Sequence, residues 1–536
     1  MKRSSFRLGL ALCVIGIWSV CGVVWAADAP APPPAASGAP KAADELDGEP
    51  PDLTPRRAIF LSMEDAVRLT LQNNVDIKVD SISPLILAEN ITMAKAKFDW
   101  TFVSSYQETH SALPSSSALS GAATNRTDTA QAQTGFQKNL ITGGNIQPGV
   151  KWERDKTNSA FTTINPSYTT NAFLTISQPV MRNAGLEVNL SGIHLASNFA
   201  AIARYTFKQN VISILGDMQG TYWDLVFAIE DLDVKKKSLR LTKDTLYQTR
   251  AQVEAGLLAP IEITRVRADV ASQEEVILLA QKNVEDKEDL LRRFINQRAS
   301  KLVEDVGVVP LQRTAYQAVE PDLDHEVREA LFTRPDYISA KLIIENCGIQ
   351  IALAKNAKLP VVDLSATLSL NGLGDDTGSS FSQLATGNFP DWTAGVSVQI
   401  PIGNRLAKAE YLQARLAKDQ SIWNLKNLEY DIIVNVKQSV RQVRTNLKSI
   451  PSTRLARELA EERLKAEEEK FNVGTALILD VLDAQTKLAQ AESAERQAVV
   501  DYNKSLILLE KNKGTLLERN RIHLSDNYTS PGTPEE

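Results

Sequence analysis

Two long stretches of the chain, residues 183–254 and 403–473, follow a helical period. At a rise of ~1.5 Å per residue, each would form a helix of roughly 100 Å, which is far longer than the core of one globular domain requires. In the first stretch the apolar side chains recur at spacings of four and three, as they do along the seam of a coiled coil. These side chains are Val211, Leu215, Met218, Tyr222, Leu225, Ile229, Leu232, Leu239 and Leu246.

A second, shorter helical stretch follows each long one, at residues 257–298 and 475–517. Because only a short segment separates the two members of each pair, we expect each pair to fold back on itself. The sequence therefore predicts two antiparallel coiled-coil hairpins. Pro451 lies inside the second long stretch, where its missing N–H predicts a kink or a break in the helix.

The residues at the two turns explain why the helices end there. Gly474 can take the left-handed conformation that ends a helix, and the hydroxyl of Thr475 can cap the helix that follows. In the first pair, Gly256 can end the long helix, and Pro260 fixes a backbone angle that suits the start of the next one. Both bends are thus predicted from local chemistry.

Six other segments alternate with a period of two, with apolar residues on one face and small polar residues on the other. Strands of about ten residues with this pattern are typical of outer-membrane barrels. The alternative is a soluble sheet that rests one face on a core, but helices of this length leave no obvious layer to cover it. The segments are about 98–109, 130–138, 145–155, 168–180, 360–371 and 392–402.

The chain also repeats itself. The stretch "AVRLTLQNNVDIK" is echoed by "VREALFTRPDY", and "VEAGLLAPIEI" by "NVGTALILDV". In each copy the order is short helices, strands, a long helix, a turn and a returning helix, so we expect an internal duplication. The predicted divisions are a first repeat at 59–300, a connection at 301–321, a second repeat at 322–518 and a tail at 519–536.

The N-terminus predicts export. Residues 1–26 have a basic start, an apolar run and a small-x-small end at Val24–Ala26, as in a signal peptide; a retained membrane helix is the alternative. Residues 27–58 are rich in proline and alanine and are expected to be a flexible linker. Removal of the signal peptide would change the formal charge from −6 to −9, which disfavours nucleic-acid binding. Only Cys347 would remain, so no intrachain disulfide is possible.

The stretch "FNVGTALILDVLDAQTKLAQAE" (471–492), within two copies of helices, strands and long hairpin, resembles the TolC family of outer-membrane efflux proteins. The resemblance covers roughly 59–517. It implies an α+β membrane protein: a homotrimer that closes one transmembrane β-barrel in outer-membrane lipid, continued by an α-helical periplasmic tunnel. The implied function is that of the outer-membrane channel in a tripartite efflux or type I secretion system. Such a channel passively conducts substrates from the periplasmic adaptor and inner-membrane pump to the exterior. The implied partners are a periplasmic adaptor (membrane fusion) protein and an inner-membrane transporter of the RND, ABC or MFS type.

Three carboxylates are candidates for the tunnel mouth. Asp480 and Asp483 lie three apart and so share a helical face, although acids near a helix start are often only partners of the helix dipole. The resemblance implies that both form the periplasmic aperture, and Glu262 holds the matching position in the first copy. A trimer would bring three such sets together, which would attract cations and raise the pKa of some of these carboxyls by crowding.

The two turns are candidates for adaptor docking by the same resemblance. The residues concerned are Gly256, Leu257, Val473, Gly474 and Thr475. A plain turn between helices would also account for all five residues, so their docking role comes from the family alone.

The chain departs from the family in two respects. Phe471 and Ala476 stand where relatives have a tyrosine and an arginine that help to close the aperture, so either other contacts close it here or its closure is looser. The first copy also carries an extra hairpin, at 130–155, which would give six strands per subunit and 18 in a trimer instead of the usual 12. The apolar face of this hairpin favours a place in the barrel, whereas Pro148 weakens the case because it cannot donate to a central ladder.

An enzyme is not indicated. The histidines His110, His194, His325 and His523 show no metal-ligand spacing, and neither a Ser-His-Asp arrangement nor a phosphate-binding loop is suggested. We therefore expect no cofactor and no metal site. A soluble periplasmic coiled-coil adaptor is the remaining alternative, and it would share the long helices but lack the alternating strands.

Overall fold

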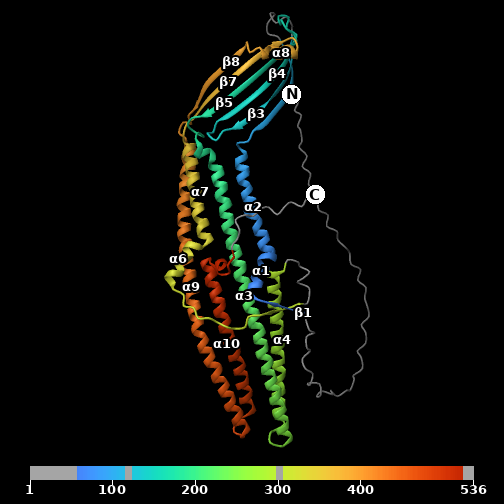
Figure 1. The fold of residues 1–536 in the computed structure, drawn as a ribbon, viewed down its shortest axis with the longest axis vertical. Coiled ribbons are helices and arrows are strands. Elements are labelled where there is room, and N and C mark those ends of the chain that lie inside the picture. The colour runs from blue at the N-terminus through green and yellow to red at the C-terminus, as the bar shows by residue number, and fades with distance from the viewer. Residues whose placement is uncertain (1–56, 115–123, 297–305, 523–536) are drawn as a thin grey trace, which may run out of the picture. The chain divides into compact units, whose positions relative to one another are not determined.

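The computed structural model describes residues 57–114, 124–296 and 306–522 (Figure 1). The expected signal peptide at 1–26 and nearly all of the linker at 27–58 lie outside these residues. So do the first five residues (301–305) of the expected connection at 301–321 and the end of the tail beyond residue 522. The expectations for those segments therefore stay predictions.

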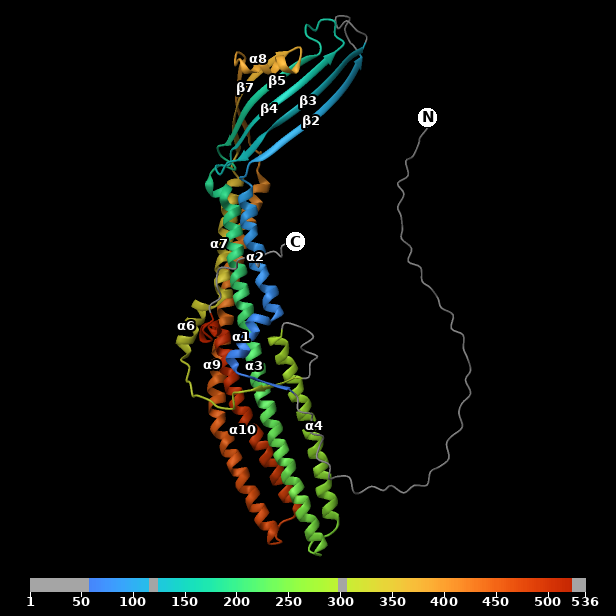
Figure 2. The same cartoon turned by 45° about the vertical axis from the view of Figure 1, so that its right-hand side comes forward.

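Four long helices form two antiparallel hairpins. They are α3 (Leu186–Glu254), α4 (Ile261–Ile295), α9 (Arg405–Asn472) and α10 (Ile478–Lys513). Helix α3 packs on α4, α9 packs on α10, and α10 also packs on α3, so the two hairpins are joined side by side. In both views their turns lie next to each other, at the end of the helices away from the sheet (Figures 1 and 2).

Helix α9 runs without a break through Pro451, so a break at this residue was a wrong expectation. Pro451 has no N–H for the Leu447 carbonyl, so the helix lacks one hydrogen bond there. The Thr453 hydroxyl donates to the carbonyls of Ser449 and Ile450, at 3.1 and 3.0 Å, but does not replace that bond. Ile450, next to the proline, is buried in the core between α9 and α10, so packing supports the helix at this point.

Shorter elements surround the middle of the long helices. The helices are α1 (Met63–Asn73), α2 (Val75–Ala96), α6 (Leu323–Thr333), α7 (Pro335–Ala357) and α11 (Leu516–Arg519). Strands β1 (Arg57–Leu61) and β6 (Val306–Pro310) pair in parallel. The largest apolar core forms where α3 meets these elements, and the hydroxyl of its fully buried Tyr222 donates to the Leu61 carbonyl at 2.9 Å.

Six antiparallel strands form one sheet in the order β2-β3-β4-β5-β7-β8. The strands β3 and β4 contain the segment 130–155, so the extra hairpin is a hydrogen-bonded part of the sheet. The bounds are β2 (Thr101–Pro114), β3 (Thr124–Asn139), β4 (Asn145–Thr157), β5 (Ser167–Pro179), β7 (Val361–Gly374) and β8 (Pro390–Gln399).

Pro148 lies inside this sheet and not at its edge. It is opposite Leu174 of β5, whereas on the other side the β3–β4 pairing skips from Gly135 opposite Gly149 to Lys138 opposite Ile146. A local gap in one ladder therefore accommodates the residue that has no N–H to donate. Because the β3–β4 pairing is interrupted at this point, Pro148 is compatible with a place inside the sheet.

The pairing gives the sheet two chemically distinct faces. Every paired position joins two even-numbered or two odd-numbered residues, so the even-numbered side chains share one face throughout. We call this the apolar face; it carries Phe102, Tyr106, Phe136, Ile146, Val150, Trp152, Leu174, Ile176, Leu364, Leu368, Leu370, Trp392, Val396 and Val398. The odd-numbered polar face carries Ser105, Gln107, Gln131, Gln133, Lys151, Glu153, Asn171, Thr175, Ser365, Thr367, Asn371, Thr393 and Ser397.

Candidate aperture and docking tips

The turns of the two hairpins have the same backbone structure. In the first, the N–H groups of Ala255, Gly256, Leu257 and Glu262 donate to the carbonyls of Ala251, Val253, Gln252 and Ala259. The equivalent bonds in the second run from Val473, Gly474, Thr475 and Asp480 to Glu469, Phe471, Lys470 and Leu477. All eight distances lie between 2.9 and 3.1 Å. We call residues 255–260 the first tip and residues 473–477 the second tip.

Both tips depend on a glycine with a positive φ. The angle is 74° at Gly256 and 77° at Gly474, which confirms the left-handed helix ends expected from the sequence. Side chains with a Cβ rarely adopt this conformation. The expected start of α4 is also confirmed, because Pro260 immediately precedes its first residue and has φ −56°.

Thr475 does not cap the helix that follows it, and that expectation was wrong. Its hydroxyl donates backward to the Lys470 carbonyl at 3.1 Å and so closes the end of α9. The start of α10 is capped instead by Asp480, whose carboxylate accepts from the Leu477 N–H at 3.2 Å. The chain reaches this arrangement because a short loop residue next to a left-handed glycine faces the last free carbonyls of the preceding helix.

Asp483 is paired with two cations. Lys487, one turn later on α10, lies 2.8 Å away, and Arg463 of α9 lies 3.1 Å away. Lys487 and then Arg463 hold the pKa of the exposed Asp483 carboxyl below its ordinary value. In a single chain, therefore, this aspartate shows the opposite of the rise in pKa expected from a crowded ring of carboxyls.

Glu262 occupies a more enclosed position than the two aspartates. Its side chain is 15% exposed and pairs with Arg265 at 2.8 Å. Its other carboxylate oxygen, Oε2, is buried and has no hydrogen-bond partner among the described residues. Within the part of the chain that the structure describes, Glu262 makes no polar contact with Asp480 or Asp483, so a single chain does not gather the three acids into one cluster.

The tips themselves present apolar side chains to solvent. Leu257 and Val473 are 76% and 74% exposed, and Thr475 is also exposed. Side chains of this kind can contact a partner without any rearrangement of the backbone beneath them. The geometry is therefore compatible with docking, although it does not identify a partner.

Behind the tips, the two hairpins share an apolar core. It contains Leu239, Leu246, Val266, Val270, Ile277, Ile478 and Leu482, and Phe471 packs against it. The Gln485 side chain also donates to the Thr245 hydroxyl at 3.0 Å, joining α10 to α3 in a buried position. Where relatives are expected to use a tyrosine, this chain thus places a phenylalanine that joins the hairpins by packing.

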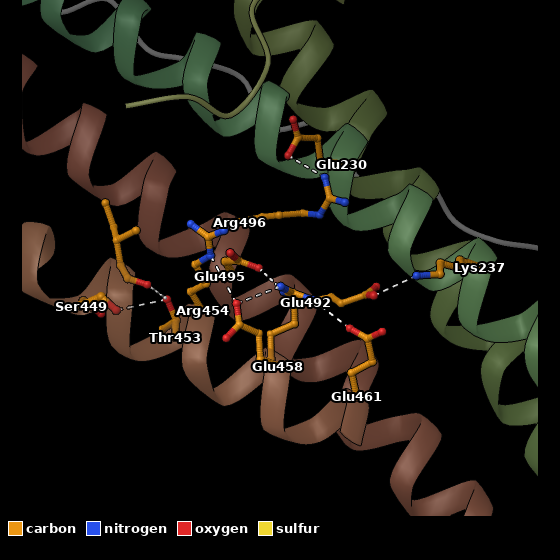
Figure 3. A network of polar contacts seen from close by, with 12 residues as sticks. Glu230, Lys237, Ser449, Thr453, Arg454, Glu458, Glu461, Glu492, Glu495 and Arg496 are labelled. Carbon is orange, nitrogen blue, oxygen red and sulfur yellow. Dashed lines mark hydrogen bonds and ion pairs between the residues drawn. The ribbon is translucent and has the colours of Figure 1, made fainter. Parts of the chain in front are cut away.

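Further from the tips, ion pairs connect the hairpins (Figure 3). Lys237 of α3 pairs with Glu492 of α10 at 2.9 Å, and Arg496 of α10 pairs with Glu230 of α3 at 2.9 Å. The Glu230 carboxylate also accepts from the Thr314 N–H at 3.1 Å. Partly exposed pairs of this kind each contribute only about 0–1 kcal/mol, so they set the alignment of the helices more than the stability.

Some of these partners could be found from the sequence and others could not. Lys487 lies four residues after Asp483 on one helix, a spacing that predicts an ion pair. Arg463 lies on the opposite helix, so its pairing depends on the register of the hairpin, which the sequence did not specify. The packing role of Phe471 was missed for the same reason.

One histidine does lie among acids, contrary to the expectation that the histidines show no ligand spacing. Ligand atoms of His325, Glu326 and Glu329 lie within 4.8 Å of one another. The buried ammonium of Lys513 already pairs with both glutamates, at 2.5 and 2.8 Å. The cluster is therefore a salt-bridged contact between α6 and α10 and not an assigned metal centre.

Among the described residues, the helices do not include one that is both long and apolar enough to span a membrane.

Comparison with known proteins shows what this chain is similar to. Residues 327–515 match the model of the "Outer membrane efflux protein" family. The chain is 23% identical over 342 residues to "Outer membrane protein TolC" of Escherichia coli (strain K12), covering 63% of this chain and 68% of that protein. The chain is therefore similar to TolC-like outer-membrane efflux proteins. This similarity places it in the bacterial outer membrane, with its helical part in the periplasm.

Solved structures agree on the fold. The Campylobacter jejuni CmeC outer membrane channel matches with a TM-score of 0.63 at 16% identity, covering 85% of this chain and 86% of that one. A structure of CusC matches with a TM-score of 0.64 at 14% identity, covering 87% of this chain and 98% of that one. This TolC-like chain thus shares the fold of outer-membrane channels.

A further relative was found by sequence. The "Pyoverdine export outer membrane protein OpmQ" of Pseudomonas putida is 23% identical over 314 residues, 56% of this chain and 62% of that protein.

Proposed function

We propose that three copies of this chain form a channel-tunnel that passively conducts substrates from the periplasm to the exterior, as part of a tripartite efflux or type I secretion system. The six strands of each copy would contribute to one shared transmembrane barrel, and the helices would continue it as a periplasmic tunnel. A periplasmic adaptor and an inner-membrane pump of the RND, ABC or MFS type would deliver the substrate. Two internal repeats, represented by the matching tips, would build each subunit.

The observation that carries this proposal is a pair of incomplete surfaces on opposite sides of the chain. In the described residues, β2 and β8 each pair on one side only. An open edge in lipid would leave backbone polar groups unsatisfied, so the sheet must be closed by another copy. Pairing of β8 with β2 of the next copy would repeat head to tail and could close a ring.

The group of helices next to the sheet also has two open sides. The packing order is α2 on α3, α3 on α7 and α7 on α9, which leaves one side of α2 and one side of α9 open. Each open side carries a stripe of exposed apolar residues at coiled-coil spacing. The stripe on α2 contains Val75, Val79, Ile82, Ile86 and Met93, and the stripe on α9 contains Leu412, Leu416, Trp423, Tyr430 and Val434.

The two faces of the sheet support a barrel with a polar interior. The apolar face would contact lipid, and the polar face would line the pore with hydroxyls, amides and the Lys151–Glu153 pair, whose atoms lie 2.6 Å apart. With six strands per copy, a trimer would close a barrel of about 18 strands, wider than a barrel of four strands per subunit.

At the other end, we propose that Asp480, Asp483 and Glu262 of each copy form the aperture. The support is their place near the starts of α10 and α4, with Asp480 and Glu262 in the first turns and Asp483 one turn later, beside tips that lie next to each other (Figure 2). The tip residues Gly256, Leu257, Val473, Gly474 and Thr475 would be the docking points for the adaptor, since they are the outermost groups of the hairpins.

The trimer is tested by a charge placed in the α9 stripe. Trp423 is 67% exposed, so Trp423→Glu should fold but lose association, whereas Asn424→Glu, exposed on the same helix but outside the stripe, should keep the trimer. We expect the wild-type chain and the control to migrate as a heat-resistant trimer in detergent and the Trp423 variant as a monomer. A wild-type chain that fractionates as a soluble periplasmic monomer would support the adaptor alternative and end the proposal.

The aperture is tested separately in planar bilayers. Asp480→Asn with Asp483→Asn removes both charges while asparagine can still cap α10. We expect higher single-channel conductance and weaker block by multivalent cations, with no change in a control that carries Asp324→Asn on the exposed surface of α6. Unchanged conductance and block would assign both aspartates to local roles in the helix.

A further inference from the structure

The connection between β7 and β8 forms a short helix, α8 (Thr377–Ala385), that lies on one face of the sheet. Helix α8 contacts β7 and β5 and sits at the end of the sheet away from the long helices (Figure 1). The fully buried hydroxyls of Thr170 and Ser380 are 2.8 Å apart, which joins α8 to β5. Because Thr170 is even-numbered, α8 covers the apolar face.

Two glycines of β7 make room for this helix. A Cβ on Gly372 would lie 2.1 Å from the Ser380 carbonyl oxygen, and one on Gly374 would lie 2.1 Å from the Ser379 hydroxyl oxygen. Both glycines are even-numbered and so belong to the apolar face. The helix therefore packs directly on the backbone of β7, which fixes it against the side of the sheet that would face lipid.

The position of α8 along the strands coincides with a change in the chemistry of that face. The cross-strand row that contains Gly372 includes Tyr106, Trp152 and Thr170, and the next row brings in Tyr168, whose ring centroid lies 6.1 Å from that of Trp152. Rows nearer the long helices are apolar, with Leu174 opposite Leu368.

Rows further from the helices carry charge. The row of Tyr168 and Gly374 also contains Arg154 and Glu108, and the next row on this face holds Asp128, hydrogen-bonded to His110, and Lys156. An aromatic band between an apolar zone and a charged zone marks the membrane–water boundary of an outer-membrane barrel. Helix α8 therefore lies at the level of this boundary.

The amino-acid composition of α8 is suited to the membrane–water boundary. Residues 377–390 contain no charged side chain, whereas Asp375, Asp376 and Asp391 flank them. The underside of the helix is formed by small groups such as Ser380, and Phe381 is 43% exposed. An uncharged helix with small polar side chains and an outward aromatic ring fits the zone between headgroups and acyl chains.

We propose that α8 is an interfacial helix that contacts the lipid of the outer leaflet and inserts Phe381 at the boundary between headgroups and acyl chains. This inference rests on the proposed function, because it requires the apolar face of the sheet to contact lipid. The occupant of the exposed side of α8 is lipid and not a protein partner, since α8 rises directly from the lipid-facing side of the strands and shares its aromatic band.

The test uses bimane attached to single cysteines in the processed, trimeric protein, reconstituted into phosphatidylcholine vesicles with or without brominated acyl chains. The background carries Cys347→Ser to remove the buried native thiol. Phe381→Cys reports on α8, and Ser382→Cys is a second reporter in case the first variant does not fold. Leu368→Cys on the apolar face is the lipid control, and Ser397→Cys on the polar face is the water control.

We expect brominated lipid to quench the fluorescence at 381 to an extent comparable with that at 368, and aqueous iodide to quench mainly at 397. Quenching at 381 by iodide and not by lipid would overturn the inference, and so would protection from both quenchers, which would mean that protein covers α8. In either case, lipid quenching at 368 would leave the proposed function intact. A lack of lipid quenching at 368 itself would instead refute the membrane barrel.

Discussion

The two tips have the same backbone but different side-chain partners. Four hydrogen bonds and one left-handed glycine recur at equivalent positions, whereas Glu262 pairs with the Arg265 side chain and its equivalent Asp480 accepts from the Leu477 N–H. Only the second tip has Asp483, which pairs with Lys487 of its own helix and Arg463 of the opposite helix. The backbone is fixed by residues within one turn, so a repeat preserves it, while the side-chain partners differ between copies without changing the turn.

The largest effect is expected from replacing the tip glycines. Gly256→Val or Gly474→Val forces a β-branched residue into a left-handed conformation, which costs about 1–2 kcal/mol. An added Cβ would meet nothing within 4 Å at either site, so the cost should be purely a backbone effect and equal at both tips. Hydrogen exchange of the Leu257 and Thr475 amides should become faster.

The matched control for this change is Gly220→Ala in α3, where an added Cβ also meets nothing within 4 Å and φ is not positive. Alanine there should stabilise the helix by about 0.5–1 kcal/mol. Unequal effects at the two tips would show that the tips are less alike than their hydrogen bonds indicate.

A smaller effect, confined to one tip, is expected at Asp480. Asp480→Ala removes the acceptor of the Leu477 N–H and should destabilise the first turn of α10 by about 0.5–2 kcal/mol, while Asp480→Asn should largely preserve it. Glu262→Ala should leave the start of α4 less affected, because that carboxylate pairs with a side chain. Hydrogen exchange of the amides in the first turns of α10 and α4 measures both effects. Equal destabilisation of the two first turns would contradict the expected difference between Asp480 and Glu262.

The effect of the two cationic partners on the pKa of Asp483 can be measured by titration. Lys487→Met should raise the pKa of Asp483 toward its ordinary value of about 3.9, and Arg463→Met should raise it less. Because the folded pKa is lowered, the stabilisation from these pairs is present above the unfolded pKa and is lost as the pH falls through the folded pKa. The two variants should therefore lose less stability on acidification below about pH 4.

Carboxyl NMR of protein labelled at aspartate measures this pKa directly. Lys465→Met is the control, since Lys465 is the main group that lowers the pKa of Glu461 and it does not contact Asp483. An Asp483 titration that does not move in Lys487→Met would mean that the pair does not form in solution.

The smallest effect is expected at Arg265. This side chain is 52% exposed and pairs with Glu262 three residues earlier, so Arg265→Met should change stability by no more than about 0.5 kcal/mol. Thermal unfolding in detergent should be nearly unchanged. A large loss would indicate that the enclosed Glu262 depends on this arginine for more than a surface ion pair.

The sequence predicts those features that depend on neighbours along the chain. Helical periods, alternating strands and the two glycines are local signals, and each led to an element close to its observed bounds. The alternation of apolar and polar residues in the segment 130–155 likewise predicted correctly that it belongs to the sheet, although Pro148 had suggested otherwise.

Features that depend on contacts between distant segments were not predicted. The pairing of Arg463 with Asp483 and the packing of Phe471 require the register of one helix on another. The backward bond of Thr475 was missed for a different reason, because its hydroxyl had two helix ends within reach and the sequence does not rank them. Helix α8 was missed because glycine, serine and threonine in residues 377–387 suggest a loop.

The two edge strands, β2 and β8, have a consequence for biogenesis. A single newly exported chain carries strand edges at β2 and β8 that lipid cannot satisfy, and such edges also invite pairing with unrelated chains. In the proposed trimer, insertion into the bilayer and assembly of the subunits would therefore be coupled steps. A chain that inserts before neighbouring copies are present would keep both edges open.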